Sequence, residues 1–146
     1  MNIDISHLNM RDVDWSINSI INRIKSHDIL MQYFIQKEFI PWTQTQKSLF
    51  IESIFIRAPM LQLVMHSDHN NYTIIDGLNR LNTIIEYIDN KFELCNLAFL
   101  TDFEGNYFSD FNRAYQRRIE ETRIKTYVIE SIGNPELSKI VAKNYF

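Results

Sequence analysis

Residues 72–88, YTIIDGLNRLNTIIEYI, indicate the fold class of this chain. Their first residues form an apolar, β-branched run that is typical of a strand, and Asp76-Gly77 ends that run. Leucines and isoleucines then recur at helical spacing from Leu78 onward, so we expect a helix that begins directly after the glycine. A strand that continues at once into a helix is typical of an α/β or α+β protein.

The segments on both sides of this motif also alternate between helical and strand patterns. We expect helices over residues 12–25, 44–57, 78–88, 110–121 and 136–146, strands over residues 29–36, 61–65, 71–76, 91–94 and 123–130, a hairpin loop at 66–70 and a turn at 133–135. Asp12 or Asp14 would cap the first helix, and Thr43 or Thr45 the second. These elements predict a small mixed sheet flanked by helices, in a single domain over the whole chain.

The composition excludes several classes of protein. The chain has 146 residues, of which 45% are hydrophobic and 23% charged, as in ordinary globular proteins, so wholesale disorder is excluded. A single cysteine excludes a disulfide scaffold, and no apolar run approaches the ~18 residues of a membrane span. The N-terminus has no signal-peptide pattern, so we expect a cytoplasmic protein without membrane association. A formal charge of −3 argues against a domain that mainly clamps nucleic acid.

The start of the helix after Gly77 is a candidate anion site. The first N–H groups of a helix have no internal partner and the helix dipole is positive there, which favours a phosphate. Arg80 in the first turn would add a cation, and Gly77 would let an anion approach the backbone closely. Asp76 would then orient Arg80, hold a metal or bind a ribose hydroxyl. In the structural alternative, which spacing alone favours, Asp76 caps the helix and Arg80 pairs with it or with Glu52.

Several segments resemble a known family, in the order and spacing that the family shows. Residues 74–94, IIDGLNRLNTIIEYIDNKFEL, resemble the "(I/V)DGQQRLTTI" signature of the N-terminal domain of GmrSD-type restriction endonucleases. Residues 34–42, FIQKEFIPW, and 46–65, QKSLFIESIFIRAPMLQLVM, occupy the places of the family's opening segments. Residues 123–130, RIKTYVIE, are similar to its later strand. The resemblance covers about residues 30–132.

This resemblance implies a fold similar to the ParB/sulfiredoxin-like nucleotide-binding domains. It also implies binding and hydrolysis of a nucleoside triphosphate, with Mg²⁺ as an accompanying ion, in a modification-dependent restriction system that defends against phage DNA. The nucleotide-binding residues carried over from the family's motifs are Asp76, Gly77, Asn79, Arg80, Gln36 and Lys37. The resemblance assigns no catalytic residue.

The chain departs from the family at three places. Leu78 and Asn79 replace the two glutamines of the signature, and Lys37 replaces an arginine, which keeps the charge but loses the bidentate guanidinium. The sequence also reaches Phe146 before the segment with which the family usually completes the pocket. We therefore expect weak or no turnover, and whether the chain is an enzyme stays open. The alternative is a non-enzymatic interaction module, a phage or mobile-element protein or a remnant, that binds a defence-system protein or DNA. A homo-oligomer is also compatible with the sequence.

One basic cluster is a candidate DNA contact. The cluster comprises Arg113, Arg117, Arg118, Arg123 and Lys125. Its first two members share one face of the expected helix. A contact with the DNA backbone would make the affinity fall steeply with added salt. In the alternative, the cluster is a solvated face paired with Glu120 and Glu121.

Three other features have structural interpretations. His66, Asp68 and His69 lie together in the expected hairpin loop, and the sequence offers no further ligands at metal spacing, so no metal site is predicted. Cys95 has no neighbour that would make it a catalytic thiol, and we expect it to pack as a small hydrophobic residue. Trp42 matches a tryptophan of the family and is expected to pack against the signature helix.

Overall fold

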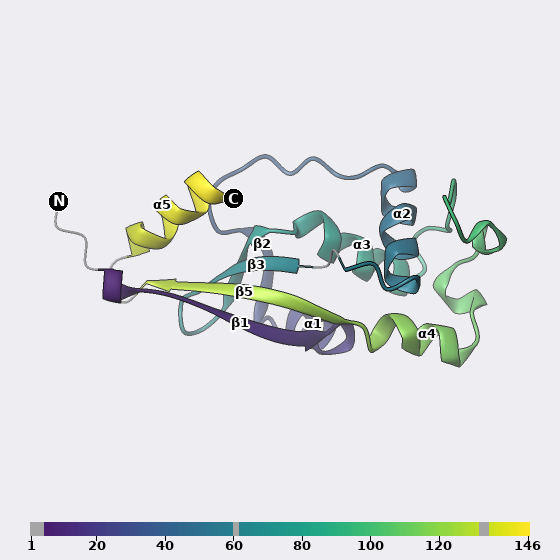
Figure 1. Cartoon of the computed structure of the whole chain (residues 1–146), viewed down its shortest axis with the longest axis horizontal. Coiled ribbons are helices and arrows are strands. Elements are labelled where there is room, and N and C mark those ends of the chain that lie inside the picture. The colour runs from purple at the N-terminus through teal and green to yellow at the C-terminus, as the bar shows by residue number, and fades with distance from the viewer. Residues whose placement is uncertain (1–4, 60–61, 132–134) are drawn as a thin grey trace.

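The structure is a computed structural model that describes residues 5–59, 62–131 and 135–146. Its α-helices are α1 (Ile17–Lys25), α2 (Gln44–Phe55), α3 (Leu78–Ile88), α4 (Arg113–Glu120) and α5 (Pro135–Tyr145). Its strands are β1 (Leu8–Ser16), β2 (Ile29–Tyr33), β3 (Gln62–Ser67), β4 (Tyr72–Asp76) and β5 (Arg123–Ser131). Three short 3-10 helices are η1 (Ile5–His7), η2 (Thr101–Phe103) and η3 (Phe108–Asp110). The mixed α/β class predicted from the sequence is confirmed (Figure 1).

The five strands form one mixed sheet in the order β1-β5-β3-β4-β2. β1 pairs with β5 and β3 with β4 in antiparallel fashion, whereas β3 pairs with β5 and β2 with β4 in parallel. These directions bring the carboxyl ends of β2 and β4 to the same edge of the sheet as the amino ends of β3 and β5. The candidate site begins at this edge, because β4 continues there into α3.

The larger hydrophobic core lies between one face of the sheet and helices α1, α2 and α3. Strands β3, β4 and β5 contribute alternate residues to it, as expected for a sheet with one face packed. The fully buried side chains at its centre include Ile20, Ile51, Ile54, Leu63, Met65, Ile74, Leu81 and Ile124. Burying one such side chain stabilises the folded state by roughly 1.5–3 kcal/mol relative to leaving it exposed.

The opposite face of the sheet is covered over only part of its area. Val64, Ile75 and Ile129 pack there against Ala142 of α5 and against Phe34, which follows β2. Figure 1 shows α5, in yellow, close to the end of the sheet where β5 finishes. The other part of this face carries charged residues, which line a hollow described below.

The helix predicted over residues 12–25 is wrong over residues 12–16, because residues 8–16 form β1. Val13 and Trp15 alternate with aspartates, and this period of two suits a strand that pairs along its whole length with β5. The helix begins only at Ile17, and Ser16 caps it by accepting a hydrogen bond from the Ser19 N–H at 3.1 Å. Neither Asp12 nor Asp14, the two residues predicted to cap this helix, has a capping role, because both lie within β1.

The second helix begins as predicted. Thr43 is its N-cap, and a reciprocal capping box joins Thr43 to Gln46. The predicted hairpin is also present, but its loop is shorter than expected, because β3 continues through His66 to Ser67. Within that loop, the Asp68 carboxylate accepts the N–H groups of Asn70 and Asn71. The turn predicted at 133–135 falls mostly outside the described residues.

Residues 89–111 contain no strand, so the strand predicted over 91–94 is wrong. The chain is instead held by polar side chains from the helices. The hydroxyl of the fully buried Tyr87 donates to the carbonyl oxygen of Asn106 at 3.0 Å. Glu52 of α2, only 4% exposed, accepts the backbone N–H groups of residues 98–100. None of the described helices has the length and apolar character required to span a membrane.

Candidate functional site

Gly77 joins β4 to α3 in a conformation that requires glycine. It is the N-cap of α3 and has a φ of +111°, in the left-handed region that side chains rarely adopt. A Cβ atom at this position would also overlap the Cδ2 atom of Leu63. No side chain of the described residues caps the helix, so the first N–H groups of α3 have no side-chain acceptor there. This start of α3 therefore retains the capacity to bind an anion.

Three charged or aromatic residues gather beside this helix start. Asp76 is half-buried at the end of β4, and Tyr33 ends the neighbouring parallel strand β2. Burial raises the pKa of the Tyr33 hydroxyl, and the nearby Asp76 carboxylate raises it further. The Nζ atom of Lys37 lies 5.2 Å from the centroid of the Tyr33 ring, a cation–π distance. The structure thus places Lys37, one of the predicted binding residues, next to Tyr33, whose hydroxyl interacts electrostatically with the Asp76 carboxylate.

Asn79 fixes the segment that follows β2. Its Oδ1 atom accepts the backbone N–H of Trp42 at 3.0 Å, and its Nδ2 atom donates to the carbonyl oxygen of Ile40 at 2.9 Å. The amide therefore acts as a clamp between α3 and the segment of residues 34–43. The Trp42 ring packs on Phe50 of α2, with 5.5 Å between ring centroids. The tryptophan is thus bonded to the signature helix through its backbone, while its ring contacts the neighbouring helix.

Arg80 does not pair as the structural alternative expected. Its Nη1 atom donates to the carbonyl oxygen of Gln62 at 2.7 Å, rather than to Asp76 or Glu52. This bond ties α3 to the start of β3 and leaves the other N–H groups of the guanidinium for a ligand. The idea that Asp76 caps the helix is likewise wrong, because Gly77 occupies the N-cap position.

Four of the six residues expected to bind a nucleotide, Asp76, Gly77, Asn79 and Arg80, lie at the start of α3, and Lys37 is placed beside Tyr33, which ends the neighbouring strand. Gln36 and Lys37 are exposed in the segment after β2. Asn79 and Arg80 are half-buried and already hold backbone groups. The arrangement could bind phosphate through the α3 N–H groups, with the guanidinium of Arg80 in the first turn of the helix.

A comparison of the sequence with models of protein families identifies the family of this chain. The family model described as the N-terminal domain of GmrSD restriction endonucleases matches residues 17–144. The chain belongs to this family. The match extends beyond the segment of about residues 30–132 in which the motifs were noticed, and it links the chain to restriction systems. Neither the comparison with curated proteins nor that with solved structures found a match.

The basic cluster of this GmrSD-family domain is largely engaged in contacts within the chain. Arg113 pairs with Glu120, as the alternative of a solvated face expected. The Nε atom of Arg118 donates to the carbonyl oxygen of Phe55 at 2.7 Å and so satisfies the end of α2. Arg117 is exposed, and none of the described residues pairs with its guanidinium. A DNA contact at this cluster stays a prediction.

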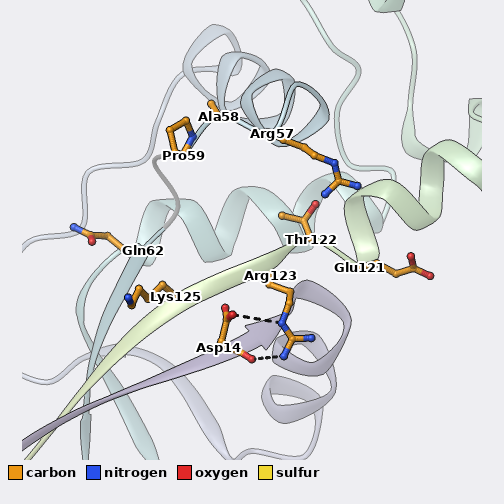
Figure 2. A pocket seen from close by; sticks show the side chains of 9 residues that line it. All are labelled: Asp14, Arg57, Ala58, Pro59, Gln62, Glu121, Thr122, Arg123 and Lys125. Carbon is orange, nitrogen blue, oxygen red and sulfur yellow. Dashed lines mark hydrogen bonds and ion pairs between the residues drawn. The ribbon is translucent and has the colours of Figure 1, made fainter.

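The other two members of the cluster line a hollow of about 730 Å³ on the partly covered face of the sheet (Figure 2). Arg123 points toward Asp14 of β1, with 3.5 Å between Nε and Oδ2, and Lys125 lies 3.5 Å from Asp12. Arg57, at the end of α2, reaches toward the same hollow from above. The walls of the hollow therefore carry charges of both signs, unlike a surface whose role is to neutralise phosphate groups.

The residues set aside in the sequence have structural roles. His66 is buried in β3 and stacks on Phe34, with ring centroids 3.9 Å apart. Cys95 is half-buried among polar groups rather than purely apolar ones, and its N–H donates to the Ser48 Oγ atom at 3.0 Å. No group of three or more potential metal ligands occurs among the described residues.

Sequence reasoning missed two residues beside the helix start. Tyr33 and Phe39 flank the predicted Gln36 and Lys37. Tyr33 lies just before the segment that resembles the family's opening motif, and Phe39 lies within it, but neither was assigned a role. Tyr33 could have been noticed as the last residue of a strand that enters a charged segment. Phe39 could not have been singled out, because an isolated aromatic residue in a connecting segment is ordinarily expected to pack against the core.

Proposed function

We propose that this domain binds a nucleoside triphosphate at the start of α3, as the sensing part of a restriction system. The observation that carries the proposal is the N-terminus of α3, which has no side-chain cap, follows a left-handed glycine and has Arg80 in its first turn, while Lys37 lies on the ring of the neighbouring Tyr33. Backbone N–H groups at a helix start form a ready anion site, and two cations nearby add affinity for a polyanion. Membership of the GmrSD family supports the same assignment.

Asp76 is the residue that would hold a metal ion accompanying the nucleotide. Mg²⁺ is commonly bound by one or two carboxylates together with phosphate oxygens and water. A single half-buried carboxylate at the end of β4 fits that donor set when a nucleotide supplies the phosphates. The ion would neutralise phosphate charge. Leu78 offers no group to orient an attacking water molecule, so we expect weak or no hydrolysis.

The test is the thermal unfolding of the chain with each of the four ribonucleoside triphosphates, with and without Mg²⁺. A ligand at about 100 times its dissociation constant adds roughly 2.7 kcal/mol to the free energy of unfolding, which raises the melting temperature by several degrees. We expect such a shift for at least one nucleotide. A flat response to all four would contradict the proposal.

Two variants with matched controls locate the site. Lys37→Ala should weaken binding, whereas Lys91→Ala, which removes an exposed lysine beyond the other end of α3, should not. Arg80→Ala should abolish binding. Its control is Arg118→Ala, which also removes an arginine bonded to a backbone carbonyl, so that lost stability and lost affinity are separated.

A second candidate function is a non-enzymatic module that binds another protein of the restriction system. The observation that favours it is Phe99, which is 74% exposed although the buried Glu52 holds its backbone in place. An aromatic ring displayed on a fixed loop is a typical anchor for a protein partner. Capture of a specific partner from cells with a complete system, lost in Phe99→Ala, would support this function. Unchanged capture by the variant would contradict it.

A further inference from the structure

A second hollow lies beside the proposed phosphate site. It has a volume of about 290 Å³ and lies between the edge strand β2, the first turns of α3 and the segment of residues 34–43. Its lining residues are Met31, Gln32, Tyr33, Phe39, Leu78 and Asn82. This volume is at the small end of ligand pockets, which span about 300–1,000 Å³, so it suits one ring system rather than a whole nucleotide.

The chemistry of the lining combines stacking surface with two amides. Four of the six residues are apolar or aromatic, and Gln32 and Asn82 can each both donate and accept hydrogen bonds. Phe39 remains 36% exposed at the hollow. An exposed ring next to a mostly apolar hollow with amide groups matches a planar heterocycle, because every nucleobase offers a π-face and a polar edge.

The hollow is joined to the phosphate site through shared residues. Leu78, which lines the hollow, is the first residue of α3, where the uncapped N–H groups lie. Tyr33 lines the hollow as well, and the ammonium group of Lys37 lies over its ring at a cation–π distance. Asn82 is one helical turn beyond Leu78, about 6 Å along the helix axis. A ribose spans a distance of this order between its base and its 5′-phosphate.

Phe39 is held at the hollow by the clamp of Asn79. The carbonyl oxygen of Ile40, the residue after Phe39, accepts a hydrogen bond from the Asn79 amide, and the Trp42 N–H donates to it. The aromatic wall is thus attached to the same helix turn that would bind phosphate. A preorganised wall of this kind lowers the entropic cost of binding.

We propose that this hollow is the nucleobase subsite of the chain, with the base against Phe39 and its polar edge toward the amides of Gln32 and Asn82. The inference rests on the proposed function, since it assigns the base of the nucleotide whose phosphates the start of α3 would bind. Leu78, which is only 7% exposed, lines this hollow and packs at the same time into the main core.

The test compares nucleotides with inorganic tripolyphosphate, which has the phosphates without a base, in a calorimetric titration of the full chain. The wild type should bind at least one nucleoside triphosphate about tenfold or more tightly than tripolyphosphate, in line with the gain from stacking one base. Phe39→Ala should remove this preference and leave the affinity for tripolyphosphate unchanged. Leu49→Ala is the control, because it truncates a similarly exposed apolar residue, 39% exposed, on α2.

Other outcomes separate this inference from the proposed function. Equal affinity for nucleotides and tripolyphosphate in the wild type, or an equal loss of both in Phe39→Ala, would overturn the base subsite while the phosphate site stands. Failure of every ligand to bind would overturn both. A second variant, Asn82→Leu, tests the polar edge without the ring, and should change the order of preference among the four nucleotides. An unchanged order would remove Asn82 from the subsite.

Discussion

Gly77 lies so close to Leu63 that any side chain at the glycine would overlap the leucine Cδ2 atom. The contact joins the start of α3 to β3 and places the uncapped helix end over the edge of the sheet. Gly77→Ala should destabilise the fold by about 2–4 kcal/mol, since it adds an overpacked methyl group to a strained left-handed backbone. Urea unfolding measures this loss.

Gly105→Ala is the matched control for that substitution. Gly105 also has a positive φ, +85°, but no atom of the described part of the chain lies within 4 Å of the position of its Cβ atom. Its alanine variant should lose only about 1 kcal/mol, the cost of the backbone conformation. Equal losses in the two variants would show that contact with Leu63 is unimportant.

The loop over residues 98–100 depends on Glu52. Glu52→Ala leaves three backbone N–H groups without their acceptor, and hydrogen bonds to charged groups contribute roughly 1.5–3 kcal/mol each. We expect a loss of at least about 3 kcal/mol in the free energy of unfolding. Glu104→Ala, which removes the acceptor of the Leu97 N–H alone, should lose only about 1 kcal/mol, because Glu104 is exposed and water can replace its carboxylate as an acceptor. If Glu52→Ala lowered the free energy of unfolding no more than Glu104→Ala does, this account would be contradicted.

The clamp of Asn79 can be measured at one amide. Asn79→Ala should speed hydrogen exchange at the Trp42 N–H and lower stability by about 1 kcal/mol, because one donor and one acceptor lose their partner. Asn79→Asp keeps the acceptor for Trp42 and should exchange more slowly than the alanine variant. Asn18→Ala, at an exposed position of α1, is the control. Identical exchange in both Asn79 variants would exclude the clamp.

His66 should make stability depend on pH. Burial lowers the pKa of its imidazole from the ordinary value of 6.5, although the carboxylates of Asp68 and Glu130 partly oppose this shift. Below pH 6.5 the unfolded chain therefore binds more protons than the folded chain, so stability should fall as the pH decreases from 6.5 through the folded pKa. Melting temperatures between pH 5 and 8 measure the effect.

His66→Phe should flatten this pH dependence while preserving the stack on Phe34. His69→Asn, at an exposed hairpin position with a positive φ of 81°, should leave the dependence unchanged. A variant without His66 that still loses stability between pH 6.5 and 5 would assign the effect to another group. Asp68 titrates in a different range, because hydrogen bonds from Asn71 and Asn70 lower the pKa of its carboxyl below the ordinary value of 3.8.

Much of the fold could be predicted from local patterns. The run from Tyr72 to Ile88 gave the strand, the glycine and the helix correctly, because these elements depend on neighbouring residues. Residues 8–16 were not recognised as a strand, because their conformation depends on pairing with β5 near the other end of the chain. The apolar residues from Val13 to Ile24 cross a strand–helix boundary, and their spacing alone imitates one continuous helix.

The candidate site was predictable in position but not in detail. Asp76, Gly77 and Arg80 stood out because they interrupt an apolar pattern at the end of a strand. The backbone partners of Asn79 and Arg80 could not be inferred, since Ile40, Trp42 and Gln62 approach them only in the folded chain. Neither could the hollow beside Phe39, for which the packing of three separate segments is required.

The position of β5 between β1 and β3 has a consequence for the order of folding. β1 is an edge strand whose one sheet neighbour is β5, and Arg11 and Glu130, which pair across the two strands, are 119 positions apart. Closing so long a loop is slow, and it cannot start before β5 has left the ribosome. Until β5 has been synthesised, the nascent chain therefore carries β1 as an unpaired strand, which makes interruption of synthesis between β1 and β5 a route to aggregation.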